Sequence, residues 1–139
     1  MNTLYLFPAE QTVFDSLSAD LKDGWSVEAE EKTYEDSAQK RAIRLSMARV
    51  HDPVLMHLRD KAYKAGTVEE VAGYINETDL KRVDEDDIAE LFFALGPDII
   101  GRLIAYMLQT AKTDTDIEGI VSLSLIRHEI YQSFAPSAR

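Results

Sequence analysis

The chain has 139 residues, of which 25 are Asp or Glu and 15 are Lys or Arg, so its formal net charge is −10. This length fits one domain with a hydrophobic core, and the 45% hydrophobic content is enough to fill that core. The composition excludes collagen-like, disulfide-framework and wholly disordered proteins. The absence of cysteine excludes thiol nucleophiles and cysteine-based metal sites.

The first residues of the chain form a short apolar run that stops at Pro8 and has no basic region before it, so we expect no secretory signal. The longest unbroken apolar run, residues 103–108, is too short to span a bilayer. We therefore expect a cytoplasmic protein with no membrane partner.

The first predicted helix covers residues 8–22, where apolar side chains recur at every fourth position. Residues 25–29 then alternate between apolar and polar side chains, which is typical of an extended segment. This segment either pairs with residues 3–7 in a small two-stranded sheet or forms part of an extended N-terminal arm. Residues 28–36 are acidic and polar, and we expect a loop there.

Two helices with many basic residues come next. The first covers residues 37–50, and its spacing predicts that Ile43, Met47 and Val50 share the buried face. The second covers residues 53–65, because an N-cap aspartate and a proline stand at its start. We call residues 38–66 the basic hairpin.

The remaining helices are predicted from a capping box, an acidic first turn, a Gly-Pro break and a long apolar pattern. They cover residues 67–75, 84–95, 97–111 and 114–134. The last of them is apolar round most of its circumference, which indicates a central position in the fold.

Together these elements predict an all-α fold, a compact bundle of about six or seven short helices. Short connections favour a single helical domain over residues 1–139, ending in a flexible tail at residues 135–139.

The sequence contains none of the common catalytic, nucleotide-binding or metal-binding motifs. His51, Asp52, His57 and Asp60 lie close together in the sequence, but a helix break separates His51 from His57. We therefore expect Asp52 to cap a helix, His51 to end one, and His57 and Asp60 to form an exposed pair, rather than a metal site. We expect His128 and Glu129 on the surface. The sequence thus predicts no catalytic residue, no cofactor and no metal.

Charge is unevenly distributed along the chain. Residues 1–37 carry nine acids and two bases, a net charge of −7, and residues 67–139 carry 14 acids and six bases, a net charge of −8. The basic hairpin carries seven bases and two acids, a net charge of +5. Its bases either pair internally with acids of the 28–36 loop or the 84–87 turn, or contact an acidic protein or a second copy, or bind nucleic acid.

Nucleic-acid binding would use residues 37–65 as a helix-turn-helix. It is disfavoured because the net negative charge of the chain repels phosphate and because the junction between the two helices lacks the usual glycine. Phe93 lies about 100° round its helix from the buried row, so it is either a second core contact or an exposed anchor for a partner.

The leading hypothesis is a non-enzymatic helical protein-interaction module of the adaptor, assembly-chaperone or accessory-factor type, which binds a protein partner or itself. The alternative is a small-molecule-binding or enzymatic helical domain whose pocket is formed by scattered residues and has no recognisable sequence motif. The candidate contact residues are Lys40, Arg41, Arg44, Arg49, Arg59 and Phe93.

Overall fold

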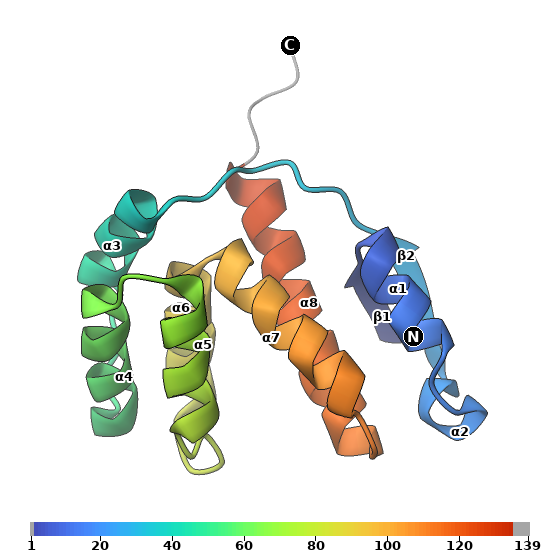
Figure 1. Ribbon diagram of the computed structural model, residues 1–139. Coiled ribbons are helices and arrows are strands. Elements are labelled where there is room, and N and C mark those ends of the chain that lie inside the picture. The colour runs from blue at the N-terminus through green and yellow to red at the C-terminus, as the bar shows by residue number, and fades with distance from the viewer. Residues whose placement is uncertain (1, 135–139) are drawn as a thin grey trace. The chain divides into compact units, whose positions relative to one another are not determined.

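The computed structural model describes residues 2–134 (Figure 1). Over this range the chain is mostly helical, with eight helices and one parallel sheet of two strands. The predicted helical fold is confirmed, and of the two arrangements considered for residues 25–29, pairing with the N-terminal segment is the one found. The predicted tail, residues 135–139, lies outside the described residues.

The described residues form two compact units. Unit 1 contains the residues up to Glu35 and those from Leu103 onward, and unit 2 is Asp36–Arg102. That residues 1–139 form one domain stays a prediction.

Unit 1 is built around the small sheet and the longest helix. Its elements are β1 (Asn2–Leu6), α1 (Pro8–Asp15), α2 (Ala19–Lys22), β2 (Trp25–Ala29), the second part of α7 (Pro97–Thr110) and α8 (Asp114–Phe134). β1 packs on α8 and α1, and β2 pairs with β1 in parallel register from Asn2↔Trp25 to Leu6↔Ala29. A parallel pair needs a crossover connection, which α1 and α2 supply.

The buried Arg127 fastens α8 to the N-terminal elements. Its guanidinium donates two hydrogen bonds to the carboxylate of Glu10, at 2.9 and 2.6 Å, and one to the carbonyl of Tyr5 at 3.1 Å. It also lies 4.1 Å from the centre of the Phe7 ring. A charge inside an apolar core is tolerated only with such partners, so this pair fixes where α8 meets β1 and α1.

Unit 2 is helical throughout its regular elements, which are α3 (Ala38–Met47), α4 (Pro53–Lys64), α5 (Val68–Glu77), α6 (Glu85–Leu95) and the first part of α7. α3 packs on α4 and α6, and α4 also packs on α5 and α6. Its core contains Leu45, Leu55, Leu58, Val71, Leu91, Leu95 and Ile99.

One predicted helix proves to be two. The helix expected over residues 8–22 stops at Asp15, and α2 begins at Ala19. Ser18 takes the extended conformation of an N-cap residue, with φ −60° and ψ 152°, and the hydroxyl of Ser16 donates to the carbonyl of Val13. Serine side chains favour such ends over a continuous helix, and this accounts for the eighth helix.

Candidate protein-interaction surface

Arg44 of the basic hairpin is used inside unit 2. Its guanidinium donates to both carboxylate oxygens of Asp36, at 2.9 and 2.7 Å, and its Nε donates to the carbonyl of Ala94 at 3.0 Å. Asp36 belongs to the acidic loop and its side chain is fully buried. Part of the hairpin's charge is therefore neutralised internally, and Arg44 ties α3 to the end of α6.

Two further arginines are also engaged within this unit. The Arg59 guanidinium donates to the carbonyl of Ala48 at 3.2 Å and lies 3.5 Å from the carboxylate of Asp60, and its side chain is largely covered. Arg41 is buried on the side of α3 that also carries Leu45. The charges of Arg59 and Arg41 are therefore less accessible to a binding partner than that of an exposed lysine.

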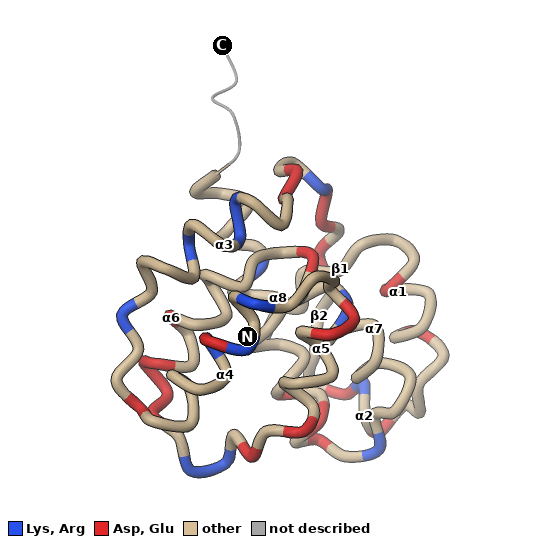
Figure 2. Tube along the Cα trace, turned by 60° about the vertical axis from the view of Figure 1, so that its left-hand side comes forward, with Lys and Arg blue, Asp and Glu red and all other residues tan. Residues whose placement is uncertain are grey.

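Lys40 and Arg49 are the exposed members of the candidate set, and Phe93 is half-buried. The α4 residues Lys61 and Lys64 are exposed too, and the ammonium of Lys61 lies 5.0 Å from the centre of the Tyr74 ring. Lys and Arg positions recur along α3 in Figure 2, but only part of this charge faces outward.

The most exposed large apolar side chains of unit 2 lie on α3. Ile43 is 56% exposed and Met47 is 73% exposed. The predicted buried face of this helix is therefore wrong, and Leu45 and Arg41 face inward instead. The reason is the anchoring of Arg44, which turns the helix, while Val50 is buried from an irregular segment beyond the helix end.

Lys40, Ile43 and Met47 have the i, i+3, i+7 spacing that places side chains in one stripe along a helix. We call these three residues the α3 stripe, which spans about 10 Å along the helix axis. α4 adds exposed apolar side chains of its own at Val54, Met56 and Tyr63.

The junction between α3 and α4 is held by a carboxylate from α6. Asp87 accepts hydrogen bonds from the backbone N–H groups of His51 and Asp52, both at 2.8 Å. These donors, with Asp52 the stronger, lower the pKa of Asp87 below the usual aspartate range. Asp52 in turn caps α4 by accepting from Val54 at 2.9 Å. Local capping thus presents α3 and α4 as a fixed pair.

No protein-family model, curated protein sequence or solved structure matches this chain.

Unit 1 contains a second polar cluster that the sequence did not predict. The Nδ1 atom of His128 lies 3.1 and 3.2 Å from the two carboxylate oxygens of the buried Glu30. The imidazole stacks on the Tyr5 ring with a centroid distance of 3.8 Å and an interplanar angle of 8°. The surface position expected for His128 is corrected to a half-buried one, whereas Glu129 is exposed as expected.

Among residues 2–134, no three His, Asp or Glu side chains lie close enough together to hold a metal ion. No single helix in this part of the chain is long and apolar enough to cross a membrane.

Proposed function

We propose that the chain is a non-enzymatic helical protein-interaction module, of the adaptor, assembly-chaperone or accessory-factor type. Its contact surface is the α3 stripe together with Arg49. The observation that carries the proposal is the exposure of Ile43 and Met47, two large apolar side chains one helical turn apart on a helix whose opposite side buries Arg41 and Leu45.

The apolar residues supply the binding energy. Burying an apolar side chain of this size completely is worth about 1.5–3 kcal/mol. More than half of each of these two side chains is still exposed, so their burial by a partner would contribute about 2–4 kcal/mol. This is the size of an interface hot spot.

The exposed bases decide the chemistry of the partner. Lys40 lies within the stripe and Arg49 follows the end of α3, so a partner with carboxylates beside its apolar residues fits best. A helix with an acidic rim and an apolar face meets both conditions. The occupant we propose is such an acidic amphipathic helix from another protein.

A second copy of the chain fits less well. Outside α3 and α4, the large hydrophobic residues that the described part of the chain exposes are Tyr106 on α7 and Leu125 on α8. α3 of a second copy offers two, but pairing the two stripes would bring the exposed bases Lys40 and Arg49 of both copies to one contact, where like charges repel. Self-association is therefore the competing outcome that the experiment below distinguishes from binding another protein.

The test uses a synthetic amphipathic helix with leucines on one face and glutamates on the other, measured by fluorescence anisotropy. The wild-type chain should bind it at least about tenfold more tightly than a version with lysine in place of glutamate, a difference of about 1.4 kcal/mol. Met47→Asp should lose this binding. Leu125→Asp is the matched control, an exposed apolar residue of unit 1, and should keep it.

Four results would overturn the proposal. One is equal affinity for the two peptides, and another is equal loss in both variants. The third is self-association in light scattering that Met47→Asp abolishes, which would make the occupant a second copy. Retardation of duplex DNA or RNA at low salt by the wild-type chain, lost in Lys40→Glu, would instead favour nucleic acid.

The alternative, a small-molecule-binding or enzymatic domain, is favoured by one observation. A buried carboxylate at Nδ1 of His128 orients the imidazole, an arrangement that general bases and ligand-binding histidines use. A thermal-shift screen with small metabolites tests it. A stabilising compound should lose its effect in His128→Gln and keep it in the exposed control His57→Gln, and a compound that acts equally on both variants would remove the alternative.

A further inference from the structure

The parallel pairing of β1 and β2 determines where each backbone group of the sheet points. The N–H of Glu30 donates to the carbonyl of Leu6 at 2.8 Å, so the backbone groups of residue 30 face β1. The backbone N–H and C=O groups of successive strand residues point to opposite sides, so the backbone groups of Ser26 and Glu28 also point toward β1. The N–H and C=O groups of Trp25, Val27 and Ala29 therefore point away from it.

The opposite edge of the sheet, on β1, is closed by side chains. The backbone N–H of Tyr5 donates to the hydroxyl of Ser124 at 3.3 Å, and its carbonyl accepts from Arg127. The N–H of Phe7, just beyond the strand, donates to the carboxylate of Glu10 at 2.8 Å. β1 is thus protected from pairing with a further strand.

The outer edge of β2 has no such protection within residues 2–134. The sheet has two strands, and no described residue hydrogen-bonds to the outward backbone groups of Trp25, Val27 or Ala29. Figure 1 shows β1 between α8 and β2, so that β2 forms the margin of the sheet. An unprotected edge strand is a template for another strand, and proteins normally block it.

The two faces of β2 differ in chemistry. Val27 and Ala29 pair in register with Leu4 and Leu6, which are fully buried, so this face is apolar. Ser26 and Glu28 lie on the other face, where the hydroxyls of Ser26 and Thr3 are 3.5 Å apart. Glu28 is exposed there. A strand added beside β2 would meet an apolar row on one face and a carboxylate on the other.

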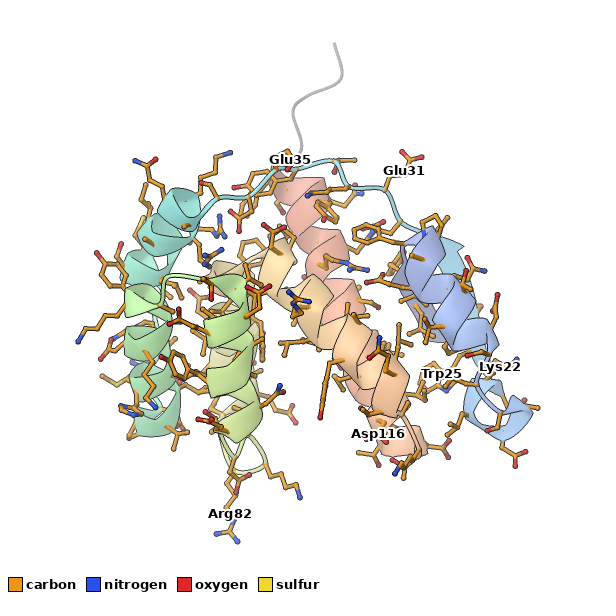
Figure 3. The ribbon with its side chains drawn as sticks, viewed as in Figure 1. Lys22, Trp25, Glu31, Glu35, Arg82 and Asp116 are labelled. Atoms are coloured by element: carbon orange, nitrogen blue, oxygen red, sulfur yellow. The ribbon has the colours of Figure 1, made fainter. Side chains whose placement is uncertain are left out.

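The surroundings of the edge are acidic as well. Asp23 and Glu31, on either side of β2, are exposed, and the Glu31 side chain projects away from the ribbon in Figure 3. The two bases nearest to β2 in the sequence both have partners: the ammonium of Lys22 donates to the carbonyl of Asp15 at 2.9 Å, and that of Lys32 lies 3.3 Å from the carboxylate of Glu35. An incoming segment is therefore favoured if it carries positive charge.

We propose that the outer edge of β2 binds an extended segment of another protein, in which basic and apolar side chains alternate, as a third strand of the sheet. The outward groups of Trp25, Val27 and Ala29 supply the main-chain hydrogen bonds, and Glu28 selects the basic side chains. This contact lies in unit 1 and does not depend on the α3 stripe.

A second copy of β2 is a poorer occupant. If two β2 strands pair antiparallel through all their outward groups, Val27 stands opposite Val27 of the other copy. Asp23 then stands opposite Glu31, which places like charges together at both ends. A basic segment from another protein avoids this repulsion.

The experiment uses the sole tryptophan of the chain, Trp25, as its reporter. The probe is a seven-residue peptide of alternating lysine and valine with blocked ends, titrated into the full chain while tryptophan fluorescence is recorded. We expect saturable binding, about tenfold or more weaker when glutamate replaces lysine. Methylating the backbone nitrogens along the edge that meets β2 should abolish binding, whereas methylating those of the opposite edge should preserve it.

Two variants of the protein complete the design. Val27→Pro removes an outward N–H and leaves the hydrogen bonds to β1 in place, so it should fold and lose the peptide. Circular dichroism checks the fold. Glu28→Lys keeps the edge open and should reverse the preference, so that the glutamate peptide becomes the tighter ligand.

The proposal is overturned if the lysine peptide does not bind, or if both methylated peptides bind equally. Equal affinity for the lysine and glutamate peptides would refute the basic partner. A dimer in light scattering that Val27→Pro abolishes would identify a second copy as the occupant instead.

Discussion

Replacing Gly96 with alanine should destabilise unit 2 through two separate effects, which are backbone strain at residue 96 and displacement of the Arg44–Asp36 pair. Gly96 has φ 93° and ψ 174°, a region that is almost exclusive to glycine. Forcing alanine into it costs about 1–3 kcal/mol. The added Cβ would also lie 2.3 Å from Nη2 of Arg44 and 2.5 Å from Oδ2 of Asp36, closer than any real contact.

The second part is the displacement of the Arg44–Asp36 pair. The Asp36 side chain is fully buried and that of Arg44 is 15% exposed, so separating them leaves an uncompensated charge. Breaking a buried pair costs about 3–5 kcal/mol. The two parts sum to about 4–8 kcal/mol, which rivals the whole stability of a small domain.

Urea denaturation followed by far-UV circular dichroism measures the effect as a change in the free energy of unfolding. The same glycine substitution is then made in the Asp36→Ala/Arg44→Ala background, where its cost should fall to the backbone part of about 1–3 kcal/mol. Gly66→Ala is the matched control, since its Cβ would lie 3.7 Å from Glu70 Oε1, an ordinary contact. Equal costs of Gly96→Ala in the two backgrounds would refute the reasoning.

Three further predictions concern other parts of the structure. Arg127→Ala should cost about 3–5 kcal/mol in urea denaturation, because it leaves a carboxylate unpaired, whereas Arg102→Ala removes an exposed pair worth about 0–1 kcal/mol; similar costs would contradict the buried pairing. Leu45→Ala should cost about 2–5 kcal/mol and Met47→Ala within about 0.5 kcal/mol, and the reverse order would mean that α3 buries its other face. The pKa of Asp87 is lowered in the folded state, so its stabilisation is complete above the ordinary aspartate pKa and is lost as the pH falls through the lower folded value. Below about pH 4 the unfolding free energy of the wild type should therefore fall more steeply than that of Asp87→Asn, and parallel profiles would be the contrary result.

Local signals in the sequence predicted helix starts well. Asp52, Thr67 and Asp84 were each expected at the start of a helix, and each side chain accepts backbone hydrogen bonds from the first turn. Capping depends on residues two or three positions apart, so a single stretch of sequence contains all that is needed. The alternating pattern of residues 25–29 is also local, and it correctly indicated an extended segment there.

Long-range contacts could not be predicted in this way. Arg127 and Glu10 are 117 positions apart, and nothing near either residue indicates the other. The face of α3 was mispredicted for the same reason. Periodicity assigns the burial of Ile43 and Met47 from their apolar character, but the bonds of Arg44 to Asp36 and Ala94 turn the helix the other way.

The candidate surface shows how a segment's net charge can mislead about binding. The net charge of +5 over residues 38–66 counts every base alike. However, Arg44 and Arg59 form their contacts inside unit 2, and Arg41 is buried. The positive charge that still faces outward is smaller than the net charge suggests, and exposed charge pairs contribute only about 0–1 kcal/mol each. In the proposed interaction, the exposed apolar side chains of α3 would therefore provide most of the affinity, while the outward bases would select partners of opposite charge and speed their encounter.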